Sequence, residues 1–115
     1  MNQVVQYFPT LDRAFAALSD PTRRAILERL GRGSATISEL AEPAGMSLTG
    51  LKKHVQVLEH AELVSTEKRG RTRICRLGPR RLEDASRWIE DYRRTWEERF
   101  DRLEQVIERK KGEST

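Results

Sequence analysis

The sequence has few of the features on which several protein classes depend. Its single cysteine excludes an intrachain disulfide and is typical of a reducing compartment. No apolar run approaches the roughly 18 residues of a membrane span, and the N-terminus lacks the basic and then apolar segments of a signal peptide. These absences predict a cytoplasmic protein with no membrane partner.

Residues that carry catalytic chemistry are also scarce. The chain has two histidines, His54 and His60, and one cysteine, Cys75. It contains no Ser/His/Asp set, no phosphate-cradling glycine loop and no cysteine–histidine pair with an orienting partner. The sequence therefore predicts neither an enzyme nor a bound cofactor.

What the chain does have is an uneven distribution of charge. The 115 residues suffice for one domain, residues 1–115, with a modest core and a net charge of +4. Residues 47–81 hold nine Lys/Arg against three Glu, a net of +6, which leaves −2 for everything else. Positive charge concentrated in one segment is expected of a nucleic-acid-binding surface.

Residues 36–63 predict two short helices joined by a tight turn. Thr36 and Glu39 have the spacing of a capping box, Gly45 can supply a left-handed turn, and Ser47 can cap the second helix. An apolar stripe at helical spacing follows along the second helix: Leu48, Leu51, Val55 and Leu58. This is the pattern of a helix-turn-helix.

The opposite face of the second helix is small at its start and basic in the middle. It carries Thr49, Gly50, Lys52, Lys53 and Gln56. Such a face suits the DNA major groove, where short side chains allow close approach and cations meet phosphates. The alternative, a merely solvated basic face on an ordinary α-helical domain, stays open for this stretch alone.

Two more helices are predicted before this motif. Residues 1–9 form an apolar lead with Val4, Val5, Tyr7 and Phe8. Thr10 can cap a helix that ends near residue 18 and has one apolar face: Leu11, Ala14, Phe15 and Leu18. Asp20 and Pro21 can open the next, which is expected to bury Ala25, Ile26, Leu27 and Leu30 and to expose Arg23, Arg24, Glu28 and Arg29.

After the motif the pattern changes to alternation. Residues 63–68 and 72–77 predict the two strands of a β-hairpin with Gly70 at its turn, and Cys75 and Leu77 on one face. The cations around the turn are Lys68, Arg69, Arg71 and Arg73. A basic hairpin directly after a recognition helix predicts a DNA-binding wing; a solvated edge strand that uses cations to avoid pairing is the alternative.

A long helix is predicted from residue 80 to residue 111, spanning about 48 Å. Its apolar residues are spaced nearly as heptads: Leu82, Ala85, Ile89, Tyr92, Trp96, Phe100, Leu103 and Ile107. A domain of this size has no core deep enough to cover such a stripe. We therefore expect it to pair with a second copy, although its first half alone could fold back on its own domain.

In its order of motifs the chain resembles the ArsR family of bacterial winged-helix repressors. The resemblance runs from about Phe15 to Leu77 through FAALSDPTRRAILERL, SELAEPAGMSLTGLKKHVQVLEHAELV and GRTRICRL. It implies a mainly α fold with a small β-hairpin, and a homodimer that binds palindromic operators in double-stranded DNA and mostly represses. It also implies dimerisation through the first and last helices. The domain would divide into a dimer-associated segment 1–18, a DNA-binding core 19–77 with its wing at 63–77, and the dimerisation helix 80–111.

By position, the resemblance implies DNA contacts on the recognition helix and the wing. On the helix these are Ser47, Leu48, Thr49, Lys52 and Lys53, and on the wing they are the tip residues 68–73. Leu48 departs from the polar residue usual there.

The resemblance also bears on metals. Many members sense them through cysteines at the positions of Thr36 and Ser38, or through a last helix that contains histidine. This chain has neither, and thiolate and imidazole are the ligands that make transition-metal sites. We therefore expect no metal site; the motif names no other effector. His54 is expected to make a structural or phosphate contact, and Cys75 to be a packing residue.

One alternative function remains, a winged-helix module that binds RNA or protein through its long helix.

Overall fold

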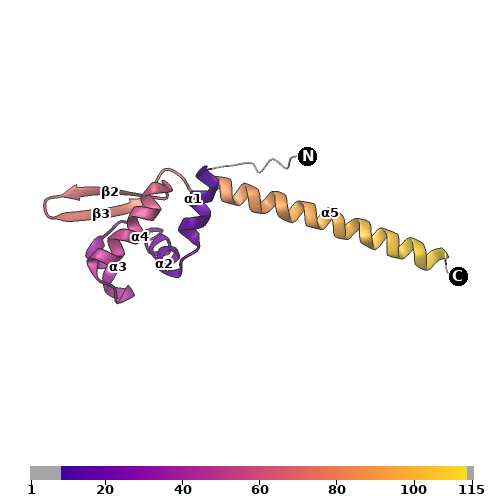
Figure 1. The fold of residues 1–115 in the computed structure, drawn as a ribbon, viewed down its shortest axis with the longest axis horizontal. Coiled ribbons are helices and arrows are strands. Elements are labelled where there is room, and N and C mark those ends of the chain that lie inside the picture. Colours follow the sequence, from indigo (N-terminus) through magenta and orange to yellow (C-terminus); the bar gives the residue numbers. More distant parts are fainter. Residues whose placement is uncertain (1–8, 114–115) are drawn as a thin grey trace, which may run out of the picture. The chain divides into compact units, whose positions relative to one another are not determined.

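The computed structural model describes residues 9–113, which divide into two compact units after Asp84. The predicted apolar lead before Pro9 lies outside the described residues. Along the first unit the elements are α1 (Pro9–Leu18), α2 (Pro21–Leu30), β1 (Ala35–Thr36), α3 (Ile37–Ala44), α4 (Leu48–His60), β2 (Val64–Arg69) and β3 (Thr72–Leu77) (Figure 1). One long helix, α5 (Glu83–Glu113), follows, and from Ala85 onward it belongs to the second unit.

The helices of the first unit begin where their capping residues predict, with one exception. The Asp20 carboxylate accepts hydrogen bonds from the backbone N–H groups of Thr22 (2.8 Å) and Arg23 (3.1 Å). Both bonds of the capping box that opens α3 are formed, and Ser47 Oγ accepts from the Gly50 N–H at 3.1 Å. Helix α1, however, begins at Pro9, so the predicted cap at Thr10 is wrong. Proline suits the first helical turn because its missing N–H has no intrahelical partner there.

The turn between α3 and α4 depends on Gly45. Its φ of 61° lies in the left-handed region, and its N–H donates to the carbonyls of Ala41 and Glu42. A side chain at this φ would crowd the following carbonyl, which is why glycine ends helices in this way. The helix-turn-helix predicted from residues 36–63 is confirmed.

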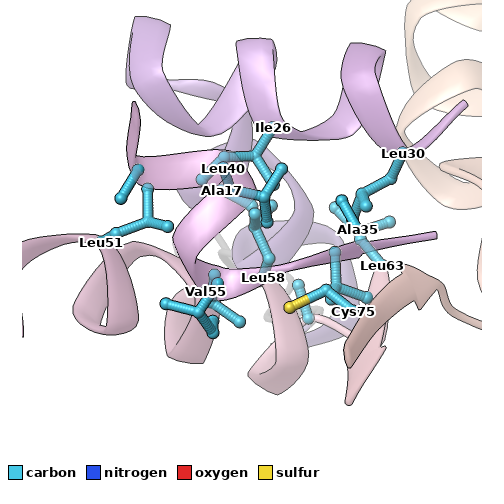
Figure 2. Close-up of a cluster of buried hydrophobic side chains, with 14 residues drawn as sticks. Ala17, Ile26, Leu30, Ala35, Leu40, Leu51, Val55, Leu58, Leu63 and Cys75 are labelled. Carbon is cyan, nitrogen blue, oxygen red and sulfur yellow. The ribbon is translucent and has the colours of Figure 1, made fainter. Parts of the chain in front are cut away.

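One apolar core joins the helices of the first unit to the sheet. Figure 2 shows the side chains of Ala17, Ile26, Leu51, Leu58 and Cys75 in this cluster, contributed by α1, α2, α4 and β3. One expectation was wrong: Ala25 is exposed beside the buried Ile26. Leu48, the first residue of α4 and of its apolar stripe, is 48% exposed. Position along the helix explains Leu48: it lies one turn before the first buried stripe residue, Leu51, at the rim of the core.

The hairpin is one part of a three-stranded antiparallel sheet in the order β1-β3-β2. Strand β2 begins at Val64, one residue later than predicted, and β3 has the predicted bounds. Gly70, with φ 62°, lies at the turn. Strand β1 was not predicted, because a strand of two residues is too short to show the alternation of apolar and polar residues. It pairs Ala35 with Cys75, so the buried thiol lies at the centre of the sheet.

Helix α5 begins three residues later than predicted. Leu82 precedes it with a φ of 67° and packs, partly buried, against the core, so its placement within the long helix is wrong. Without Leu82 the stripe from Ala85 to Ile107 advances by 4, 3, 4, 4, 3 and 4 residues. This is an 11-residue repeat rather than the expected heptad. Across residues 9–113, no helix has the length and apolar character of a membrane span.

Candidate nucleic-acid interface

Helix α4 has a buried face and an outer face, as its sequence predicts. Leu51, Val55 and Leu58 are buried. The predicted contact residues Ser47, Leu48, Thr49, Lys52, Lys53 and Gln56 are all exposed. The outer face therefore offers a cap hydroxyl, short side chains and two lysines to a binding partner. Leu48 adds an apolar contact, which in DNA suits a thymine methyl group rather than a polar base edge.

The hairpin arginines differ in how strongly they are already engaged. Arg73 donates to Thr66 Oγ1 at 2.7 Å, and the Thr66 hydroxyl donates to the Glu59 carboxylate of α4 at 2.9 Å. Arg69 pairs with Glu67 at 3.2 Å. Among residues 9–113, by contrast, Lys52, Lys53, Lys68 and Arg71 make no ion pair.

Three of these four cations, Lys52, Lys68 and Arg71, line a cleft of about 310 Å³ between α4 and the wing. Its walls combine cations, hydroxyls and two apolar side chains: Lys52, Lys68, Arg71, Arg73, Thr36, Ser38, Thr72, Ile37 and Leu48. Acidic groups are absent from this lining. The sequence predicted Thr36 as a helix cap but did not indicate that Thr36 and Ser38 lie close to the wing, because that proximity depends on the β1–β3 pairing. A positive cleft with hydroxyl donors is suited to a phosphate backbone.

The recognition helix is held to α1 and α2 by Arg23, which was predicted to be exposed but is partly buried. Its guanidinium donates to the carbonyls of Ala16 (2.7 Å) and Ala17 (3.0 Å), and its Nη1 lies 3.2 Å from Nδ1 of His54. Asp20 approaches the same imidazole nitrogen at 3.8 Å. His54 thus makes the structural contact expected of it.

Asp20 is the acidic member of this group. Partial desolvation raises the pKa of its carboxyl, but the two backbone N–H donors together with the nearby charges of His54 and Arg23 outweigh that effect and lower the pKa. The carboxylate therefore remains charged at neutral pH, next to the imidazole of His54.

Cys75 is a packing residue in this structure. Its side chain is fully buried, and burial raises the pKa of the thiol to about 11. Residues 9–113 bring together no group of three His, Cys, Asp or Glu side chains that could hold a metal ion.

A larger groove of about 450 Å³ lies between α2 and α3, away from the cleft. Arg29 and Arg32 are balanced there by Glu28 and Glu39. Since these charges cancel, the groove lacks the positive potential of the cleft between α4 and the wing.

Comparison with known proteins agrees with the class that this geometry defines, a winged helix-turn-helix. A family model described as a helix-turn-helix domain matches residues 18–67. The chain is 43% identical over 68 residues to the HTH-type transcriptional regulator Rv2034 of Mycobacterium tuberculosis, covering 59% of this chain and 64% of that regulator. It is 33% identical over 79 residues to the transcriptional repressor SdpR of Bacillus subtilis, covering 69% of this chain and 88% of the repressor.

Solved structures agree. The crystal structure of an ArsR family transcriptional regulator matches with 41% identity and a TM-score of 0.74, covering 82% of this chain and 97% of the other. The solution structure of a homodimeric winged helix-turn-helix domain from Mycobacterium bovis matches with 25% identity and a TM-score of 0.58, covering 80% and 82%. The chain belongs to the ArsR family of winged helix-turn-helix transcriptional regulators.

Proposed function

We propose that this regulator is a dimeric repressor that binds a palindromic operator in double-stranded DNA through α4 and the wing. The observation that carries the proposal is the set of exposed lysines and arginines that make no ion pair within residues 9–113. Lys52, Lys68 and Arg71 line a cleft with no acidic lining, and Lys53 lies on the outer face of α4. Phosphates fix the register of a protein on the duplex, and the short residues at the start of α4 allow approach to base edges.

Recognition of a palindromic operator requires two copies of the chain. One recognition helix makes too few base contacts to select a site, whereas two helices about 34–36 Å apart read both halves of a palindrome. The exposed apolar side chains of α5 suit self-association, and one relative is a homodimer in solution. A repressor role is supported by the similarity to SdpR. Such a regulator acts on chromosomal DNA, so we also propose a cytoplasmic location. We further propose that it has no catalytic activity.

Footprinting of the purified protein on genomic fragments, beginning with its own promoter, tests the proposal. We expect protection of two half-sites one helical turn apart. If each subunit neutralises three to five phosphates, log K should fall with log salt at a slope of roughly −5 to −9. A slope near zero would exclude this face as the DNA surface. Tighter binding to single-stranded RNA than to duplex would favour an RNA-binding module instead.

A further inference from the structure

Thr66 lies at the point where the β2–β3 hairpin leaves the core. Val64, two residues earlier on the same strand, is buried, and Cys75, which pairs with Thr66 across the sheet, is fully buried. Beyond Thr66, residues 67–73 are all exposed. The distal half of the hairpin therefore gains no core packing that would fix its direction.

The Thr66 hydroxyl joins the hairpin to the recognition helix. It donates to the Glu59 carboxylate of α4 at 2.9 Å and accepts from the Arg73 guanidinium of β3 at 2.7 Å. Within residues 9–113, no other side-chain hydrogen bond connects α4 to β2 or β3. Because one hydroxyl can donate and accept at the same time, Thr66 connects all three elements.

The charges around these contacts favour a hairpin that swings away from α4. Lys68 lies directly opposite Arg73 in the sheet, and both line the cleft that Lys52 of α4 also lines. Like charges that face one another repel. The Glu59 carboxylate opposes this repulsion from the α4 side, where it and Arg73 line the same hollow of about 260 Å³.

From these contacts we propose that Thr66 is a positioning residue for the wing. By binding Glu59 and Arg73 at once, it fixes the direction in which the hairpin leaves the core, and hence the place where Arg71 meets the DNA. Gly70 at the turn is four residues, about 13 Å, beyond Thr66, so a small rotation at Thr66 becomes a larger displacement at the tip.

The proposal rests on the DNA-binding surface proposed above and specifies what holds its two parts together. It also divides the arginines of the hairpin by role. Arg73 acts within the protein, on Thr66, whereas Arg71 at the tip acts on the DNA.

Replacement of the hydroxyl alone tests the role of Thr66. Thr66→Val keeps the shape of the side chain, and in the full-length protein it should weaken binding by about 3- to 10-fold to the duplex that the parent protects in footprinting. The salt slope should fall by about 1, because the wing loses a phosphate contact. Thr66→Ser retains the hydroxyl and should bind as the parent does. Ser65→Ala is the matched control, since Ser65 is also partly buried but lies on the other face of the sheet and makes no side-chain hydrogen bond within residues 9–113.

A double-mutant cycle separates positioning of the wing from a general loss of stability. Arg71→Ala should cost less affinity in the Thr66→Val protein than in the parent, because a displaced wing no longer places Arg71 on the DNA. Lys53→Ala, on α4, should cost the same in both. A general loss of stability would leave the two costs additive with that of Thr66→Val.

A measurement without DNA follows the hairpin directly. Spin labels at His60→Cys on α4 and Arg69→Cys near the tip report the distance between the two elements by pulsed electron paramagnetic resonance, while the native thiol of Cys75 is buried. We expect a broader distance distribution in Thr66→Val than in the parent, and an unchanged one in Thr66→Ser. Glu59→Ala removes the same hydrogen bond from the α4 side and should reproduce the broadening, so the test holds even where Thr66→Val perturbs the strand.

The possible failures are distinguishable. An unchanged distance distribution in both Thr66→Val and Glu59→Ala would overturn the positioning role and leave the proposed repressor in place. Equal costs of Arg71→Ala in the parent and in Thr66→Val would do the same. If the parent protects no duplex, the proposed function fails, and the label distances alone decide whether Thr66 orients the hairpin.

Discussion

The guanidinium Nη1 of Arg23 lies 3.2 Å from Nδ1 of His54 and so joins α2 to the recognition helix. The same guanidinium donates to two carbonyls at the end of α1. One side chain therefore fixes α4 relative to both helices that pack behind it. The orientation of the outer face of α4, on which DNA recognition depends, is determined in part by a residue that the DNA is not expected to touch.

Replacing Arg23 should therefore affect stability and binding together. We expect Arg23→Ala to lower the free energy of unfolding by about 1–3 kcal/mol, since carbonyls and an imidazole lose a charged donor, and to weaken operator binding. Urea denaturation and gel shifts measure the two effects. Arg24→Ala is the matched control, because within residues 9–113 the Arg24 guanidinium donates only to the Leu18 carbonyl, at 2.7 Å. Equal losses in both variants would contradict the role assigned to Arg23.

Lys53 and Arg71 offer a test of the DNA surface itself. Both are exposed, so we expect Lys53→Ala and Arg71→Ala each to weaken operator binding, with a salt slope reduced by about 1, and to leave the unfolding midpoint unchanged. Arg76→Ala removes the same charge, but Arg76 is already paired with Glu67 at 2.8 Å, so its loss should matter less. Unchanged affinity in both Lys53→Ala and Arg71→Ala would move the site elsewhere.

Disrupting the α5 face should abolish the dimer. Carboxylates at Trp96 and Phe100 would be buried without partners in an apolar contact, which is costly. We expect Trp96→Glu/Phe100→Glu to sediment as a monomer, to keep much of its helical circular dichroism, and to lose operator binding at concentrations where the parent binds.

The control for this variant is Arg94→Glu/Gln105→Glu, which adds carboxylates on the far side of the helix and should remain dimeric. If the Trp96/Phe100 variant also remains dimeric, α1 with its partly buried Leu11 and Phe15 becomes the better candidate for the interface.

Metal ions should not control operator binding. We expect micromolar Zn²⁺, Cd²⁺ or arsenite to leave the protein–DNA complex intact in a gel shift, because the one thiol is buried and His54 is already engaged by Arg23. Stoichiometric release of the DNA by any of these would show that the protein does have a metal site.

Much of the fold was predictable because its signals are local. The capping box at Thr36, the caps at Asp20 and Ser47 and the left-handed turn at Gly45 each depend on a few consecutive residues, and each is confirmed. The hairpin was predictable to within one residue, since alternation and a glycine turn are also local. The cations of α4 and the wing were found in the same way.

The predictions that failed concerned residues whose surroundings depend on tertiary contacts. Arg23 has the sequence context of a solvated helix face, yet its partners lie on α1 and α4. Leu82 continued the periodicity of α5, but packing against the core takes it out of the helix with a positive φ. The cleft between α4 and the wing combines α3, α4 and the hairpin, which the sequence places apart.

The sequence by itself determined the class of protein, the elements of the first unit and the apolar face of α5, because caps, turns and periodicity act over a few residues. Only the tertiary structure decided which cations remain unpaired, where α5 begins and how Thr36 and Ser38 come to face the wing. These outcomes depend on side chains distant in the chain competing for the same hydrogen bonds and the same core, and no local pattern records that competition.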